Sequence, residues 1–152
     1  MNWNLKAFDD LTASQVYKIL QARVDVFVVE QNCPYREIDD VDQLSMHLFL
    51  EEDNEIIAYA RLIPKDVLYP EASIGRILVQ KKFRQDGYGR EILKQAIATI
   101  TNQWNETKIK LHAQVYLRDF YRSFGFKEVT EEYLEDGIPH VDMLLDKLIS
   151  SN

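Results

Sequence analysis

The stretch Ser73–Leu93, SIGRILVQKKFRQDGYGREIL, decides the fold that this chain is expected to adopt. Its apolar, β-branched beginning belongs to a strand predicted over Ala72–Val79. After a short polar segment, Arg84–Gly89 (RQDGYG) predicts a glycine-bearing turn that opens a helix. Such a turn leaves backbone N–H groups unpaired at the positive end of the helix dipole, and glycine lets a ligand approach the main chain. The stretch therefore indicates a site for a phosphate or pyrophosphate.

Length and composition narrow the class of protein. The 152 residues suit a single domain over 1–152, and an apolar fraction of 46% is enough for a hydrophobic core. No segment approaches the roughly 20 apolar residues of a membrane span, and the first residues, MNWNLK, lack the apolar core of a signal peptide. A single cysteine, Cys33, argues against a disulfide framework and favours a reducing, cytoplasmic location.

The charge balance bears on the partners. The formal net charge is −7 at pH 7, whereas a general nucleic-acid binder needs a basic face. We therefore expect no nucleic acid and no membrane among the partners, and we expect small cations to be favoured. Acidic residues before and after the core could surround such a cation, although a solvated acidic face would have the same composition. These residues are Glu37, Asp39, Asp40, Asp42, Glu131, Glu132, Glu135 and Asp136.

The order of the predicted elements indicates an α/β domain with a mixed sheet. Apolar residues at helical spacing follow a cap at Thr12 or Ser14 and end near Glu30, and a second helix continues from the glycine turn. A third helix is expected over 117–124. The segment 135–139 is expected to connect the last two strands. The predicted strands cover residues 2–8, 47–51, 56–63, 72–79, 108–113, 127–132 and 141–148.

A second block of sequence, read together with the first, indicates what the glycine turn could bind. Lys110–Phe126, KLHAQVYLRDFYRSFGF, repeats the strand-then-helix arrangement further along the chain. Together the two blocks resemble the GNAT superfamily of N-acetyltransferases, which use acetyl-CoA. The resemblance runs from about residue 72 to residue 129, and the element order agrees along the whole chain. Val26–Tyr35 and Glu135–Met143 are further similar to the ElaA-like branch of this superfamily.

The resemblance implies a fold and a cofactor site. The fold would be a GNAT-type single domain, a twisted mixed β-sheet flanked by helices, with a V-shaped opening between the parallel strands 72–79 and 108–113. Acetyl-CoA or CoA would be the co-substrate, with no metal. The first strand would pair with the pantetheine arm, and the turn would hold the pyrophosphate through backbone N–H groups. Asp86 adds a carboxylate there, so its side chain should face solvent. The implied cofactor residues are Ile77, Leu78, Val79, Arg84, Gln85, Asp86, Gly87, Tyr88, Gly89, Arg90, Gln114 and Phe120.

The resemblance also implies an acid and leaves the base open. Tyr121 would be the general acid, because a phenol with a pKa of about 10 can return a proton to a departing thiolate. A core aromatic residue would show the same helical spacing. The first motif strand holds no Asp or Glu, so Glu30, His47 and His140 are candidates for the base or the substrate site. His112 is set aside, because it alternates with the buried positions of its strand.

The expected function is transfer of an acetyl group from acetyl-CoA to a primary amine by direct attack in a ternary complex. The acceptor, a small-molecule or peptide amine, is not specified by any residue pattern. A catalytically silent CoA-binding sensor or interaction module is one alternative, and a partner-binding α/β domain with structural glycine turns is another. A nucleophilic triad of Cys33, His47 and Asp42 is also considered. Apolar C-terminal strands could form a homodimer.

Overall fold

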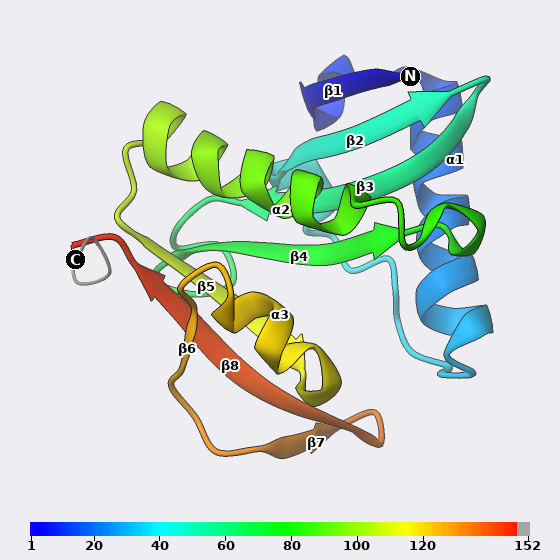
Figure 1. Cartoon of the computed structure of the whole chain (residues 1–152). Coiled ribbons are helices and arrows are strands. Elements are labelled where there is room, and N and C mark those ends of the chain that lie inside the picture. The colour runs from blue at the N-terminus through cyan, green and yellow to red at the C-terminus, as the bar shows by residue number, and fades with distance from the viewer. Residues whose placement is uncertain (149–152) are drawn as a thin grey trace.

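A mixed β-sheet of eight strands forms the centre of the computed structural model, which describes residues 1–148 (Figure 1). Its strand order is β1-β2-β3-β4-β5-β8-β6, and β7 pairs with β8. The strands are β1 Asn2–Ala7, β2 Met46–Glu52, β3 Glu55–Ile63, β4 Ala72–Val79, β5 Lys108–Gln114, β6 Lys127–Glu128, β7 Tyr133–Glu135 and β8 Ile138–Asp146. The helices are α1 Ala13–Val24, α2 Tyr88–Ala98 and α3 Arg118–Arg122, and π-helical turns over Asp25–Glu30 and Thr99–Gln103 extend the first two.

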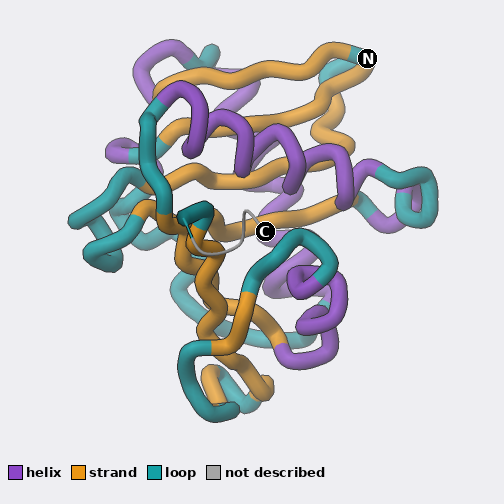
Figure 2. The backbone as a smooth tube through the Cα atoms, turned by 60° about the vertical axis from the view of Figure 1, so that its left-hand side comes forward, coloured by secondary structure: helices purple, strands orange, loops and turns teal. Residues whose placement is uncertain are grey.

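The sheet consists of two halves that meet at a short parallel contact. Strands β1 to β4 pair antiparallel, and so do β5, β6, β7 and β8. Only Ala72 and Ser73 of β4 pair with Ile109 and Lys110 of β5. Beyond this contact the second half runs obliquely to the first (Figures 1 and 2). The predicted opening between the two parallel strands is therefore present, because their pairing stops after the contact.

Helices cover both faces of the first half. Leu48 and Leu50 of β2 belong to the core that contains Leu93 of α2, whereas Phe49 between them packs in a second cluster with Ile19 of α1. Alternate residues of a strand point to opposite faces, so α1 and α2 lie on opposite sides of the sheet. No helix within residues 1–148 is long and apolar enough to cross a membrane.

The start of α1 carries the predicted cap at Thr12. The Thr12 hydroxyl accepts a hydrogen bond from the Gln15 N–H, and the Gln15 side chain accepts one from the Thr12 N–H, both at 3.0 Å. This reciprocal pair is a capping box, which satisfies two of the N–H groups at the helix start. Of the two residues considered in the sequence, Thr12 is thus the cap.

The C-terminal part of the chain departs from the prediction. The strand expected over 127–132 is only the two-residue β6, and the expected connection 135–139 instead contains the end of β7 and the start of β8. Asp136 and Gly137 form the turn between these strands, with φ angles of 52° and 77°. An Asp-Gly pair favours this type of hairpin turn. Pro139 lies inside β8, where it pairs with Leu134, although proline is uncommon within strands.

Candidate active site

A cleft of about 880 Å³ opens where β4 and β5 separate. Its walls come from the extension of α1, β4, the turn before α2, β5, α3 and the β7–β8 hairpin. Every cofactor residue predicted from the sequence lines the cleft except Asp86, whose side chain is exposed. Tyr121, Glu30 and His140 line it as well. The sheet topology thus brings most of the predicted site residues into one cavity.

Strand β4 presents one main-chain edge to the cleft. On its other edge Leu78 pairs with Tyr59 of β3, whereas pairing toward β5 ends at Ser73. A bulge at Arg76, which has a φ of 50°, shifts the register just before Ile77–Val79. A bulge of this kind bends a strand away from its neighbour. An extended ligand could therefore pair with Ile77–Val79 as an added strand.

The turn before α2 offers free backbone donors. The first hydrogen bond of α2 runs from the N–H of Glu91 to the C=O of Gly87, at 3.1 Å. The N–H groups of residues 85–90 have no hydrogen-bond acceptor among the described residues. Gly87 has a φ of 87°, a conformation that favours glycine. Because the Asp86 side chain lies outside the cleft, the turn presents main-chain donors to an anion.

Two arginines flank this turn in fixed positions. Arg84 donates to the C=O of Val79 at 2.9 Å and to the carboxylate of Glu30 at 2.8 Å. The guanidinium of Arg90 lies 4.5 Å from the centre of the Phe124 ring. Both side chains line the cleft, so they add positive charge beside the free N–H groups.

The opposite wall carries the predicted acid. Tyr121 on α3 is only 6% exposed, and its hydroxyl makes no hydrogen bond to the described residues. Burial, with a smaller contribution from Tyr116, raises the pKa of Tyr121 above its ordinary value. The phenol therefore stays protonated at neutral pH and can act as a proton donor. Phe120 packs edge-on against Tyr121, and Gln114 donates to Gln31 at 3.2 Å.

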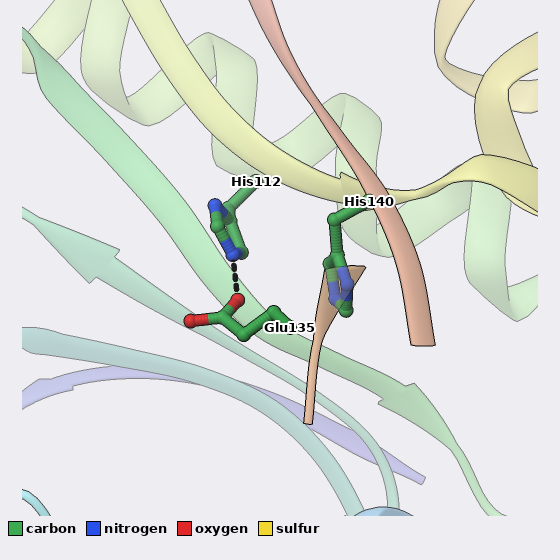
Figure 3. A group of neighbouring side chains, drawn as sticks. All are labelled: His112, Glu135 and His140. Carbon is green, nitrogen blue, oxygen red and sulfur yellow. Dashed lines mark hydrogen bonds and ion pairs between the residues drawn. The ribbon is translucent and has the colours of Figure 1, made fainter. Parts of the chain in front are cut away.

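A polar cluster lies on the β5–β8–β7 side of the cleft. His112 of β5, Glu135 of β7 and His140 of β8 point toward one another (Figure 3). His112 was set aside in the sequence, because alternation along β5 placed it opposite the apolar face. In the structure, however, the His112 side chain lines the cleft. The sequence alone could not show this, because the strand that covers His112 begins about 20 residues later in the chain.

The acidic segment after α1 is mostly buried in ion pairs. Arg23, which is fully buried, contacts Glu37 and also Asp42 at 2.7 Å, and Arg61 contacts Asp42 at 2.9 Å and Asp39 at 2.8 Å. Burial alone would raise the pKa of Asp42, but hydrogen bonds and charge from Arg23 and Arg61 hold it below its usual range. These carboxylates therefore support the wall of the cleft, and their charge is already neutralised.

His47 belongs to this buried region and does not line the cleft. Its Nδ1 lies 2.7 Å from the Tyr59 hydroxyl, and its Nε2 donates to the C=O of Asp42 at 2.9 Å. Burial lowers the pKa of His47. Cys33 lies at the cleft, where its Sγ is 3.9 Å from the C=O of Asp136. With both His47 nitrogens engaged elsewhere, the structure does not assemble the Cys33–His47–Asp42 triad.

Comparison with known proteins agrees with this geometry. The sequence profile of the Acetyltransferase (GNAT) domain matches residues 9–147. Protein ElaA of Escherichia coli strain K12 is 40% identical over 145 residues, which cover 94% of this chain and 95% of ElaA. A UPF0039 protein of Schizosaccharomyces pombe is 43% identical over 143 residues, which cover 93% of this chain and 94% of that protein.

Solved structures show the same arrangement. An acyl-CoA N-acyltransferase from Pseudomonas aeruginosa has a TM-score of 0.90 at 37% identity, covering 95% of this chain and 99% of that chain. Escherichia coli ElaA has a TM-score of 0.89 at 39% identity, covering 96% of this chain and 100% of that chain. The predicted resemblance and the predicted fold are confirmed: the chain belongs to the GNAT acetyltransferase family.

Proposed function

We propose that the protein transfers an acetyl group from acetyl-CoA to a primary amine by direct attack in a ternary complex. One observation carries the proposal. The open edge of β4, the free N–H groups of residues 85–90 and the Tyr121 phenol all border the same cleft. Family membership supports acyl transfer, and the relative from Pseudomonas aeruginosa is described as an acyl-CoA N-acyltransferase.

The residues of the cleft fit an acyl-CoA. A pyrophosphate needs several hydrogen-bond donors, and the turn before α2 supplies unpaired ones at a helix N-terminus. A pantetheine arm carries amides, which would pair with Ile77–Val79 as an added strand does. Gly89 keeps this passage open, because a Cβ at that position would lie 3.9 Å from both Phe120 and Val79. Phe120 and Gln114 would form the facing wall.

Tyr121 would act as the general acid. When the amine attacks the carbonyl carbon and the C–S bond breaks, the sulfur leaves as a thiolate and takes a proton from the Tyr121 hydroxyl. Holding the amine and the thioester together supplies a further part of the rate. The raised pKa of Tyr121 ensures that the proton is present at neutral pH.

His140 is our candidate for the base that removes the proton of the amine. Its Nδ1 donates to the C=O of Ile138 at 2.7 Å, which leaves Nε2 facing the cleft. Glu30 also lines the cleft, but its carboxylate is already engaged in an ion pair with Arg84 at 2.8 Å. His47 has no access to the cleft and is not part of the proposal.

The deciding experiment is a panel of primary amines, including a polyamine, an amino sugar and a peptide, tested for release of free thiol from acetyl-CoA. Binding of acetyl-CoA is measured in parallel by thermal shift, where ligand at 100 times its Kd should stabilise the protein by about 2.7 kcal/mol. Thiol release with at least one amine supports the transferase. Stabilisation without thiol release from any amine would favour the CoA-binding sensor. Absence of stabilisation would contradict both the transferase and the sensor.

A further inference from the structure

We propose that His112, Glu135 and His140 form a binding site for a divalent cation of the zinc class at the acceptor side of the cleft. The ligand atoms of the three side chains lie within 4.8 Å of one another (Figure 3). All three residues line the cleft, so a cation bound there would be reachable from solvent. This departs from the expectation of a metal-free site that came from the sequence.

The register of three strands places these side chains on one face. His112 of β5 lies opposite Asp142 of β8, and Gln114 lies opposite His140. On the other edge of β8, Glu135 of β7 lies opposite Ile138. Residues opposite each other, and residues two apart along a strand, share a face of the sheet. The cluster is therefore fixed by main-chain pairing, and rigid strands position ligands better than loops do.

Both imidazoles are oriented as metal ligands usually are. His140 donates from Nδ1 to the C=O of Ile138 at 2.7 Å, and Nδ1 of His112 lies 2.6 Å from the Tyr133 hydroxyl and 3.0 Å from the carboxylate of Asp142. The Tyr133 hydroxyl also donates to Asp142, which fixes that carboxylate. A ligating histidine commonly uses its second nitrogen for a backbone carbonyl or a carboxylate in this way. In both residues Nε2 is left for the cation.

The environment calls for a positive charge at the proposed position. Nε2 of His112 contacts the carboxylate of Glu135, while Nδ1 faces the Tyr133 hydroxyl and the carboxylate of Asp142. A carboxylate and an imidazole lone pair repel each other, so either a proton or a cation must lie between them. Nε2 of His140 makes no hydrogen bond within residues 1–148, and this side chain lines the cleft, so the nitrogen is free to bind a cation there.

The donor set selects the class of cation. Two imidazole nitrogens and one carboxylate suit Zn²⁺, which prefers N and O ligands in a tetrahedral arrangement, over Mg²⁺ or Ca²⁺, which prefer oxygen. Zn²⁺ would hold three protein ligands about 2.0–2.2 Å away. The fourth position would face the cleft and take water or a donor atom of a ligand.

The test is a titration of tag-free protein with Zn²⁺ in competition with a chromogenic chelator, followed by Co²⁺ as a spectroscopic probe. The chain has only three histidines, and both nitrogens of His47 are engaged, so histidine coordination can come only from the proposed pair. We expect one Zn²⁺ per chain and a tetrahedral Co²⁺ spectrum. Absence of saturable binding in the micromolar range or tighter would overturn the proposal.

Substitutions then assign the site. His112→Gln, Glu135→Gln and His140→Gln should each weaken Zn²⁺ binding by at least about tenfold, since each removes one of three ligands. Asp136→Asn is the matched control: it removes the same charge as the neighbouring Glu135→Gln, from an exposed side chain, and should leave binding unchanged. Cys33→Ser controls for the thiol. Equal binding by wild type and His140→Gln, or weakening by Asp136→Asn equal to that of Glu135→Gln, would show that the cation binds nonspecifically.

This inference and the proposed function can fail separately. The titration contains neither acyl-CoA nor amine, so its outcome does not depend on acetyl transfer. Nε2 of His140 cannot bind a cation and accept a proton at the same time. A bound cation would therefore exclude His140 as the base, and the amine panel should be run with the protein freed of metal by a chelator.

Discussion

The two sides of the cleft are built by different means. The side proposed to hold the cofactor, called the cofactor side, comes from one continuous stretch, residues 72–93, and offers mainly backbone groups: an open strand edge and free N–H groups at a helix start. The side proposed to hold the acceptor, called the acceptor side, is made of side chains from β5, β7 and β8, and it adjoins a wall held by buried ion pairs around Arg23. Backbone recognition tolerates changes of side chain, as the exposed Asp86 in the turn illustrates. The acceptor side should instead depend on individual residues.

The largest effect should come from breaking the buried ion pairs. Arg23→Met removes one of two arginine partners from each of Glu37 and Asp42, which keep only Arg76 and Arg61. Because both carboxylates stay buried, the free energy of unfolding should fall by up to about 3–5 kcal/mol. Denaturation by urea measures the change. The matched control is Lys82→Ala, which breaks an exposed pair with Glu55 and should change stability by less than about 1 kcal/mol. Equal losses of unfolding free energy in the two variants would show that the buried ion pairs contribute no more to stability than an exposed pair does.

The next effect should fall on the chemistry between the two sides. Tyr121→Phe should lower kcat by about 10²-fold, because general acid catalysis contributes at least that much, while the Kd for acetyl-CoA stays nearly unchanged. Steady-state kinetics with an accepted amine and binding by calorimetry measure the two quantities. Tyr116→Phe, a change of the same kind at an exposed residue that also lines the cleft, is the control. An unaltered kcat for Tyr121→Phe would remove this residue from the mechanism.

A smaller effect should appear in the pH dependence of stability. Burial lowers the pKa of His47 from its ordinary 6.5, so the unfolded chain binds a proton more readily and stability falls as the pH drops below 6.5. The pKa of Asp42 is also lowered, from 3.8, so its contribution is present above pH 3.8 and is lost below it. Acid should therefore weaken the fold in two stages.

The variant His47→Gln isolates the first stage. Just below pH 6.5, its free energy of unfolding should change less with pH than that of the wild type. The difference between the two slopes is at most about 1.4 kcal/mol per pH unit, because a single group titrates. Urea denaturation at several pH values gives both curves. Parallel curves for the two proteins in this range would contradict the assignment to His47. The affinity for acetyl-CoA, which belongs to the other side of the cleft, should be the same in both.

The smallest effect is expected for Gly89→Ala on the cofactor side, where stability and cofactor affinity should change in opposite directions. Gly89→Ala places a methyl group 3.9 Å from Phe120 and Val79, where the free protein has room for it. Alanine favours the helix, so stability should rise by up to about 1 kcal/mol. The same methyl group narrows the passage for the cofactor, so the Kd for acetyl-CoA should rise several-fold. Lys94→Ala, at an exposed position of α2, should leave the Kd unchanged, and a similar Kd for Gly89→Ala would contradict the proposed passage.

Most elements of the cofactor side could be predicted because their signals are local. β4 begins and ends at the predicted residues, and α2 begins at the glycine turn. The β7–β8 hairpin was missed, because residues 135–139 were expected to connect strands 127–132 and 141–148, whereas the turn is only Asp136-Gly137. That error had a consequence for the site. Without β7, no partner for His112 or His140 could be foreseen.

The sequence by itself determined the fold class, and it placed the glycine turn at 84–90 and Tyr121 as site candidates, because each signal depends on residues close together in the chain. Only the tertiary structure decided what Glu37, Asp42 and His47 do, since their roles follow from burial beside Arg23 and Tyr59. It also decided that His112, Glu135 and His140 meet. Their meeting depends on strand register, and a shift of one residue would turn these side chains to the other face.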